Sequence, residues 1–391
     1  MKILVITSRV PWPLEKGDKL RAYNQIKELA KNNEIILCAL NDAGIHPDAE
    51  KELKKFCAAV HTIRFSRLGV FFHLLRGIFS GLPFQVAYFT SVSARKKTDA
   101  LIRTARPERI YCQLIRTAEY ARAHPEIPRV IDYMDVFSKG VERRIGKVNA
   151  LKRPLFRIEW KRLLRYEAAV FSDFEGHTII SAQDRDLMPV KEKEKIVVIP
   201  NGVDTDFFAP REAKKDYELL FNGNMSYPPN VESVLYIVHK ILPQVWKKRP
   251  GVRLLISGAN PSAEVLALQS DKVTVTGWVD DVRDSFARSQ MLVAPMQSSI
   301  GLQNKLLEAM SMRIPCITTT LSNNAIKAVP DSQVLVADTP EQFAAHIETL
   351  LEYPEKAAQL AENGYRMVHD RFNWEQTCSQ LEKLIADAGK K

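Results

Sequence analysis

The chain has 391 residues, of which 46% are hydrophobic and 26% are charged. This balance is ordinary for a globular protein, and it excludes a disordered chain, a collagen-like repeat and a small disulfide-bonded scaffold. At roughly 150 residues per domain, the length predicts two or at most three domains.

Cysteine usage and hydropathy indicate the compartment. The five cysteines are an odd number, and no two are spaced as C-x-x-C. This argues against a disulfide framework or a zinc ribbon and favours a reducing environment. Met1-Lys2 leads directly into an apolar strand pattern, so we expect no signal peptide, and no apolar run reaches the roughly 20 residues of a membrane-spanning helix. We expect a cytoplasmic protein, soluble or held peripherally on the inner face of the plasma membrane.

The net charge of +10 is unevenly distributed. Residues 1–200 hold 36 Lys+Arg against 23 Asp+Glu, an excess of +13, whereas the remainder holds 20 against 23, or −3. A basic first half predicts a polyanionic partner, which on charge alone is nucleic acid, an anionic lipid or a phosphorylated substrate. Solubility alone is the alternative explanation.

The first half alternates short apolar runs with amphipathic stretches. This alternation predicts right-handed crossovers and a parallel sheet. We expect a helix over about residues 19–31 and strands over Ile3–Thr7, Glu34–Ala39, Val60–Phe65, Arg109–Cys112, Val130–Asp132, Thr178–Ser181 and Ile196–Ile199.

The second half repeats the scheme. The expected strands are Leu219–Phe221, Arg253–Ile256, Val273–Thr276, Met291–Ala294, Cys316–Thr319 and Gln333–Val336. The expected helices are Val231–Trp246, Val282–Ala287, Gly301–Met312 and Pro340–Leu351. A last amphipathic helix, about Trp374–Ala386, fits against either half.

A turn signal near the middle divides the chain. Asn201-Gly202 lies between Pro200 and Pro210, and such a run favours a loop over a continued element. Two doubly wound halves joined there leave a cleft between them, and ligands of open parallel sheets bind at the carboxyl ends of the strands. We therefore predict that the site lies in this cleft.

The segment 295–315 carries the most chemistry. It runs from a strand through a loop into a helix expected to begin near Gly301, where free N–H groups favour a phosphate. Lys305 and Glu308 lie on one face of that helix. A lysine can neutralise a diphosphate, and a carboxylate can accept two hydrogen bonds from a ribose diol. An ordinary surface ion pair, on a helix whose Leu306 and Leu307 face the core, explains the pair equally well.

Two segments of the first half offer polar groups at strand ends. Gly17 permits close backbone approach after the first strand, and Arg21 on the following helix could reach an anionic acceptor. The plainer reading is a turn capped by Asp18. Asp132 and Asp135 end another strand, where one carboxylate could orient an acceptor hydroxyl; Asp135 fits a helix N-cap equally well.

Several segments together resemble retaining glycosyltransferase family four, in the order and spacing of that family. They are Pro200–Asp204 (PNGVD), Phe221–Asn230 (FNGNMSYPPN), Val275–Val282 (VTGWVDDV), Asn304–Met310 (NKLLEAM), Ile314–Ile317 (IPCI) and Phe372–Trp374 (FNW). The form GLQNK at Gly301–Lys305, with D-x-x-D-V-x-S at Asp132–Ser138, is most similar to the sugar transferases of bacterial exopolysaccharide assembly.

The resemblance implies a GT-B fold, with two Rossmann-like doubly wound domains facing across a cleft. An acceptor domain would cover residues 1–200, with the C-terminal helix of about 372–391 packing back on it, and a donor domain residues 201–371. The implied activity is retaining transfer of a sugar from a nucleotide diphosphate donor to a glycan or lipid-linked acceptor in exopolysaccharide or cell-surface polysaccharide synthesis. No cofactor and no metal is expected, and no nucleic-acid partner.

The resemblance also assigns residues to roles. Asp135, Lys305 and Glu308 are the expected catalytic residues. The donor would be held by Gly223, Asn224, Gly258, Gly277, Gly301, Leu302, Gln303 and Asn304. The acceptor would be held by Gly17, Asp18, Arg21 and Asp132.

Two departures from the family pattern motivate an alternative. The family usually carries two glutamates seven residues apart in sequence, and the first position here is Ile300. Many relatives also carry an Arg and a Lys in the loop after the first strand of the second domain, where this chain has residues 224–227 without a cation. The alternative is a non-catalytic GT-B scaffold or regulator of the same pathway.

Residues 64–165 combine basic and apolar character. They hold 22 Lys+Arg against 8 Asp+Glu, and they include the apolar run 68–89 and a helical period of apolar residues near 151–164. An anionic membrane surface suits such a segment. Core helices with solvated outer faces explain it equally well.

Overall fold

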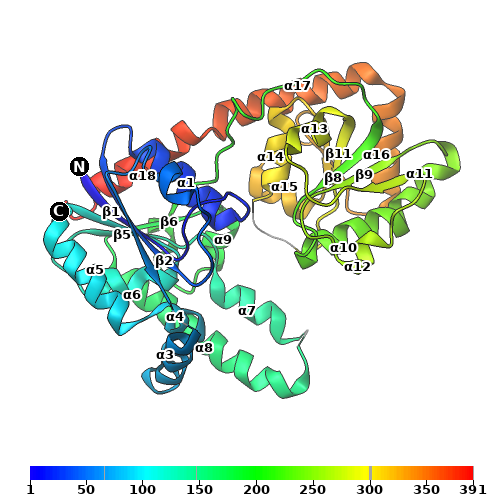
Figure 1. Cartoon of the computed structure of the whole chain (residues 1–391). Coiled ribbons are helices and arrows are strands. Elements are labelled where there is room, and N and C mark those ends of the chain that lie inside the picture. The colour runs from blue at the N-terminus through cyan, green and yellow to red at the C-terminus, as the bar shows by residue number, and fades with distance from the viewer. Residues whose placement is uncertain (66, 147, 299–301, 391) are drawn as a thin grey trace. The chain divides into compact units, whose positions relative to one another are not determined.

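A computed structural model describes residues 1–65, 67–146, 148–298 and 302–390. The chain forms two compact units, each built around its own parallel sheet (Figure 1). Unit 1 comprises Met1–Pro200 together with Trp374–Lys391, and unit 2 comprises Asn201–Asn373. The predicted class, α/β with two doubly wound parallel sheets, is confirmed.

The seven-stranded sheet of unit 1 has the order β3-β2-β1-β4-β5-β6-β7, and its strands pair in parallel. The chain order reverses between β1 and β4, which makes the carboxyl ends of these two strands the switch point of the sheet. The strands are β1 (Lys2–Thr7), β2 (Glu34–Asn41), β3 (Ala59–Arg64), β4 (Arg109–Gln113), β5 (Arg129–Asp132), β6 (Gly176–Ile179) and β7 (Val197–Val198).

Helices cover both faces of this sheet, which explains why its strands read as continuous apolar runs. Alternate residues of β1 face opposite layers: Leu4 and Ile6 join the core under α4, α5, α6 and α8, whereas Ile3 and Val5 join the core under α1, α2 and α18. The helices are α1 (Gly17–Leu29), α2 (Ala49–Leu53), α3 (Arg67–Ser80), α4 (Phe84–Phe89), α5 (Val92–Ala105), α6 (Ala118–Arg122), α7 (Phe137–Ile145), α8 (Arg153–Asp173), α9 (Ala182–Leu187) and α18 (Trp374–Asp387).

The C-terminal helix α18 packs on unit 1. Leu381 and Ile385 are buried in the same core layer as α1, Asn33 donates a hydrogen bond to Glu382 at 2.7 Å, and the Arg109 guanidinium donates to the Ile385 carbonyl at 3.1 Å. The apolar stripe predicted for this helix is therefore its contact surface.

The six-stranded sheet of unit 2 has the order β10-β9-β8-β11-β12-β13, and its strands also pair in parallel. Its switch point lies between β8 and β11. The strands are β8 (Tyr217–Asn222), β9 (Leu254–Ser257), β10 (Val273–Val275), β11 (Ser289–Ala294), β12 (Cys316–Thr318) and β13 (Leu335–Val336).

Helices again form two layers in unit 2. Leu219 and Phe221 of β8 face the layer of α10, α11 and α16, and Leu220 faces the layer of α13, α14 and α17. The helices are α10 (Pro228–Tyr236), α11 (Leu242–Lys248), α12 (Ala263–Leu266), α13 (Val282–Ala287), α14 (Asn304–Ser311), α15 (Thr320–Ile326), α16 (Pro340–Glu352) and α17 (Pro354–Arg371).

Two expectations about helices need correction. The helix predicted from Gly301 begins at Asn304, because the backbone of Gln303 is extended. The helix predicted over Val231–Trp246 contains a turn of π-helix at Ile237–Ile241 between α10 and α11. Across the described residues, no helix is both long and apolar enough to cross a membrane.

Candidate functional site

Three glycines lie next to one another at the carboxyl ends of β8, β9 and β10. Gly223, Gly258 and Gly277 have φ values of 150°, 140° and 70°, which disfavour a side chain. The Gly258 N–H donates to the Gly277 carbonyl at 3.0 Å. A Cβ atom added to Gly258 would lie 1.9 Å from the Gly223 carbonyl oxygen. The structure thus brings together three of the predicted donor-binding residues, along a sheet edge where backbone is accessible.

Lys305 reaches this glycine row from the first turn of α14. Its Nζ donates to Asn230 Oδ1 at 2.7 Å and lies 4.0 Å from the centroid of the Phe221 ring. A Cβ atom added to Gly223 would come within 3.3 Å of the same Nζ. The lysine is 8% exposed, so a cation stands almost buried beside the switch point of unit 2.

Glu308 lies one turn further along α14 and is half-buried. The buried side chain of Asn222, the last residue of β8, donates a hydrogen bond to it. Asn222 Oδ1 is buried and has no partner among the described residues. Leaving a buried acceptor unpaired costs roughly 1–3 kcal/mol, so this oxygen is suited to a hydrogen bond donated by a ligand.

Burial favours the uncharged forms of both Lys305 and Glu308 and so moves their pKa values towards neutral pH. Burial lowers the pKa of Lys305 to about 7, against the opposing charge of Glu308. Burial raises the pKa of Glu308 to about 7, against the charge of Lys305 and the hydrogen bond from Asn222. An anion placed beside Lys305 would favour its protonated form. The pair is therefore poised to respond to a charged ligand near neutral pH.

The start of α14 is held by the segment that joins the units in sequence. Asn201 Nδ2 donates to Asn304 Oδ1 at 3.2 Å, and the Leu306 N–H donates to the Gln303 carbonyl at 3.0 Å. Gln303 is buried, and Leu302 packs against the apolar layer of α14 rather than standing free.

Two positions singled out in the sequence cannot be placed. Gly301, an expected donor-binding residue, and Ile300, the position of the missing glutamate, lie outside the described residues. The N-terminal N–H groups of α14 that would serve an anion are those of its first turn from Asn304 onward.

The loop after β8 is organised by Asn224, another expected donor-binding residue. Its side-chain oxygen accepts from the Ser226 N–H at 3.0 Å, and its carbonyl accepts from Asn230 Nδ2 at 2.9 Å. Because Asn230 also accepts from Lys305, it couples the loop to the lysine. The sequence pattern included Asn222 and Asn230 only as parts of a motif; their positions at the end of β8 and at the start of α10 were the available signal.

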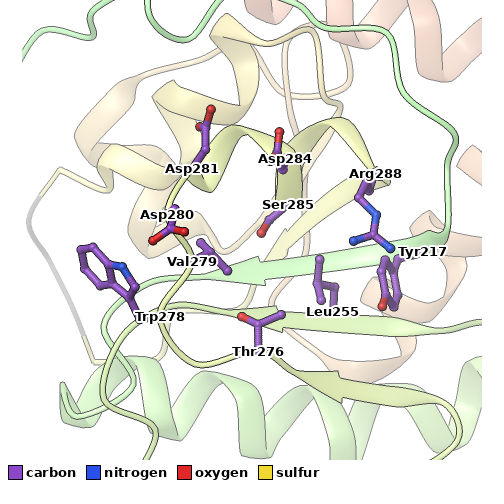
Figure 2. Close-up of a pocket in the computed structure, with 10 residues that line it drawn as sticks. All are labelled: Tyr217, Leu255, Thr276, Trp278, Val279, Asp280, Asp281, Asp284, Ser285 and Arg288. Carbon is purple, nitrogen blue, oxygen red and sulfur yellow. The ribbon is translucent and has the colours of Figure 1, made fainter.

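A cavity of about 380 Å³ lies beside the Gly277 turn. Figure 2 shows Trp278 at one side of it and Tyr217 with Arg288 at the other. Asp280, Asp281 and Asp284 line the side nearest α13, and hydrogen bonds from Arg283 help to lower the pKa of Asp281 to about 2. A lining with three carboxylates repels a diphosphate, so this cavity does not suit that group.

In unit 1 the structure gives Arg21 and Asp132 a role that corrects the prediction. Both side chains are fully buried. Arg21 Nε donates to Asp132 Oδ2 at 2.6 Å, and the Tyr111 hydroxyl donates to the same oxygen at 3.0 Å. The ion pair links α1 to β5 inside the unit. Because both side chains are fully buried, neither is accessible to an acceptor substrate.

Gly17 and Asp18 lie at the start of α1. Gly17 is exposed and has nothing within 4 Å of an added Cβ. Asp18 pairs with Arg9 and accepts from the Lys19 N–H at 3.1 Å. Its own carbonyl accepts from Gln113 Nε2 at 2.9 Å, so this turn is bound to the end of β4.

Asp135 is exposed, three residues beyond the end of β5. The N-cap of α7 is Val136, so the alternative reading of Asp135 as that cap is wrong. Desolvation by the surrounding protein, followed by the negative charges of Asp184 and Asp132, raises the pKa of this carboxyl above its ordinary value. Asp135 is thus an exposed residue beyond the carboxyl end of β5 whose carboxyl group has a raised pKa.

Arg116 was missed by sequence reasoning. Its guanidinium lies over the rings of Phe89 and Phe137, at 5.5 and 4.9 Å from their centroids. Burial and the charge of Arg9 lower its pKa, and nearby carboxylates that include Asp135 oppose this effect. Arg9 and Arg116 are the first cations after β1 and β4, the strands that flank the switch point, and that placement was the available signal.

A metal ion would need a group of ligating side chains close together. Within the part of the chain that the structure describes, no group of three His, Cys, Asp or Glu side chains is arranged to hold a metal ion. The expectation of a metal-independent protein remains a prediction.

A match to a known protein family lies within unit 2. Residues 216–353 match the family model described as glycosyl transferases group 1. Over this range, unit 2 is similar to the glycosyltransferase group 1 family. The match contains β8, Lys305 and Glu308, and the three glycines.

Longer matches cover the whole chain. An uncharacterised 44.6 kDa protein in the cps region of Klebsiella pneumoniae is 19% identical over 98% of this chain and 99% of its own length. Anabaena HepE, solved in complex with UDP, is 13% identical with a TM-score of 0.71 over 99% of this chain and 100% of that one. WaaG, a glycosyltransferase involved in lipopolysaccharide biosynthesis, is 14% identical with a TM-score of 0.67 over 98% and 99%. The fold is GT-B.

Proposed function

We propose that this protein is a retaining glycosyltransferase of family four that moves a sugar from a nucleotide diphosphate donor. The observation that carries the proposal is the geometry around Lys305. A nearly buried ammonium group stands beside three adjacent glycines, in the first turn of a helix that follows a strand at the switch point. Backbone N–H groups, a helix N-terminus and a cation form the set of groups that binds a diphosphate.

The residues around Lys305 support particular roles. Charge develops on the leaving diphosphate in the transition state, and Lys305 with the first turn of α14 would stabilise it. The carboxylate of Glu308 would accept from the ribose hydroxyls. Asn222 Oδ1, buried without a partner among the described residues, would accept a further hydroxyl of the donor.

For the acceptor we propose a role for unit 1. Asp135 is exposed, and its raised pKa suits a group that orients a hydroxyl and shares its proton. Arg9 and Arg116 would attract an acceptor that carries a phosphate or carboxylate. Gly17 and Asp18 would line the same end of the sheet, because Asp18 pairs with Arg9 and accepts from Gln113 at the end of β4.

The substrates named for similar proteins support the donor class. HepE has been solved with UDP and with UDP-glucose, and WaaG is described as acting in lipopolysaccharide biosynthesis. Together with the exopolysaccharide form of the GLQNK motif, they support a glycan or lipid-linked acceptor in bacterial polysaccharide synthesis.

A specific observation favours the second candidate, a non-catalytic GT-B scaffold or regulator. The loop 224–227 contains no cation, and its polar groups bond within the loop and to Asn230. Lys305 would then hold a diphosphate with little help from other side chains.

The two candidates predict different outcomes of one experiment. The protein is soaked with a mixed library of nucleotide sugars, and mass spectrometry identifies what remains bound and whether free nucleoside diphosphate is released on adding glycan acceptors. An enzyme retains one donor class and releases its diphosphate. A scaffold that binds no nucleotide sugar would contradict our proposal.

A further inference from the structure

Helix α3 exposes a stripe of large apolar side chains. Phe71, Phe72, Leu75, Ile78 and Phe79 are all exposed, and Phe79 is 88% exposed. The spacings 71, 75, 78 and 72, 75, 79 place them on one face of the helix. An isolated exposed phenylalanine needs no explanation, but five large apolar residues on one helical face mark a contact surface.

A second stripe lies on the segment that leads into α8. Leu151, in the turn Ala150–Lys152, is 88% exposed, and Leu155 and Ile158 on α8 are also exposed. Their spacings of four and three residues again define one helical face. Further along α8, Leu163 and Tyr166 pack on the core of unit 1, whereas the stripe belongs to the preceding part of the segment and stays exposed. The packing of unit 1 therefore does not involve this second stripe.

Direct contacts hold the two helices together. The Arg162 guanidinium of α8 donates to the carbonyls of Gly77 at 2.9 Å and Ile78 at 2.9 Å, both on α3. Glu159 of α8 accepts from the Phe84 N–H at 2.6 Å, at the start of α4. Figure 1 shows α3 beside α8 in unit 1. We call the two stripes together the α3–α8 surface.

The charges around this surface have one sign. Residues 150–165 contain six Lys or Arg and a single acidic residue, Glu159, and that carboxylate is buried and bonded to backbone. The cations Arg153, Arg157 and Lys161 are exposed. The segment of α3 contains no acidic residue. An apolar face bordered by cations fits a partner with an apolar interior and an anionic surface.

We propose that the α3–α8 surface docks this protein in the plane of an anionic lipid bilayer. The phenylalanines and leucines would enter the boundary between headgroups and acyl chains, and the cations would lie on the lipid phosphates. A second copy of the chain is a poorer occupant, because it would bring two cationic surfaces together. The inference goes beyond the proposed function and does not depend on it.

The test is co-sedimentation with vesicles of phosphatidylcholine alone and of an equal mixture with phosphatidylglycerol. We expect binding to the anionic vesicles that weakens as salt is raised. The double variant Phe72→Glu/Phe79→Glu should lose at least about tenfold in binding, since charges replace inserted rings. Arg157→Ser/Lys161→Ser should lose about fivefold for each cation removed.

Leu266→Glu is the control, because it also replaces an exposed apolar side chain by glutamate, here at a residue of unit 2 that is 52% exposed. It should bind vesicles like the unaltered protein. Equal vesicle binding by the unaltered protein and Phe72→Glu/Phe79→Glu would overturn the proposal, as would no binding to anionic vesicles.

Sedimentation velocity tests whether a second copy of the chain occupies the α3–α8 surface instead. Self-association that Phe72→Glu/Phe79→Glu abolishes, without vesicle binding, would assign the surface to a second copy and overturn the proposal. Calorimetric titration of the same variants with UDP separates this test from that of the donor site, since we expect their nucleotide affinity to be unchanged.

Discussion

At the scale of single residues, the account depends on how burial tunes Lys305 and Glu308. An ammonium group that is 8% exposed loses most of its hydration, and the half-buried carboxylate one turn away offsets only part of that loss. The pKa values of both groups therefore meet near 7.

We predict a bell-shaped pH dependence of donor binding. Above pH of about 7 Lys305 loses its proton, and affinity for a nucleotide sugar should fall by up to about tenfold per pH unit. Below pH of about 7 Glu308 gains a proton and accepts more weakly from the ribose diol, so affinity should fall there as well. Calorimetric titration with UDP-glucose between pH 5 and 9 measures this.

The variant Glu308→Gln isolates the acidic side of the profile. It should remove the fall in affinity that protonation of Glu308 causes, and it should move the fall that Lys305 causes to lower pH, because the charge of Glu308 raises the pKa of Lys305. A profile that is flat across this range in the unaltered protein would show that neither group titrates at the donor.

Residue-scale burial also explains the wrong predictions. Asp132 is the last residue of β5 and is still enclosed by the sheet, whereas Asp135, three residues later, is exposed. Sequence shows that both lie near a strand end. It does not show that Arg21 and Tyr111 converge on Asp132, because these contacts join residues 111 and 21 positions apart in the chain.

At the scale of elements, the strand ends of unit 2 need residues without side chains. Gly258 combines a φ of 140° with a neighbouring carbonyl oxygen 1.9 Å from where a Cβ would be. Any side chain there would displace the end of β8 from the end of β9. The glycines predicted from the resemblance therefore have a structural reason that is independent of it.

We predict that Gly258→Ala is destabilised by at least about 2 kcal/mol, the sum of backbone strain and the steric clash. It should also bind UDP-glucose more weakly, because the Gly223 carbonyl must move. Urea denaturation followed by circular dichroism gives the free energy of unfolding. Gly251→Ala is the control, since nothing lies within 4 Å of its added Cβ, and it should change stability by less than about 0.5 kcal/mol. Equal stability of the two variants would contradict the packing described here.

Element types were largely predictable, and element edges were less so. Hydrophobic runs and periodicity placed the strands of both sheets, because parallel strands covered on both faces are apolar throughout. The start of α14 was predicted three residues too early, at Gly301, although Asn304 is of an N-cap residue type. The Asn304 side chain accepts a hydrogen bond from Asn201, about one hundred residues earlier, and the sequence does not show this contact.

The exposed side of α8 could not be predicted either. Leu155 and Leu163 lie on the same helical period in the sequence, yet Leu163 is buried and Leu155 is exposed. Periodicity shows that a helix has apolar positions; what covers them depends on the elements that pack against it. Here the core of unit 1 covers one group, and we propose that lipid covers the other.

At the scale of the whole molecule, the chain divides into two units that each enclose their own core. The division falls at the Pro200–Asn201 turn, and α18 returns the end of the chain to unit 1. Donor chemistry is proposed for unit 2 and acceptor chemistry for unit 1. The proposed donor residues follow from local strand–loop–helix geometry, which the sequence encodes. The proposed acceptor cations, Arg9 and Arg116, depend on the strand order of a complete sheet, which the sequence does not show directly.

The central claim is that an activated sugar's diphosphate binds beside Lys305. Its most direct test is calorimetric titration of the unaltered protein and of Lys305→Met with UDP, GDP, ADP and TDP, with Lys248→Met, an exposed lysine of the same unit, as control. We predict that at least one nucleoside diphosphate binds, that Lys305→Met weakens it by about 10- to 100-fold through loss of a charged hydrogen bond, and that Lys248→Met does not. Equal affinity of Lys305→Met and the unaltered protein, or no binding of any of the four, would contradict the account.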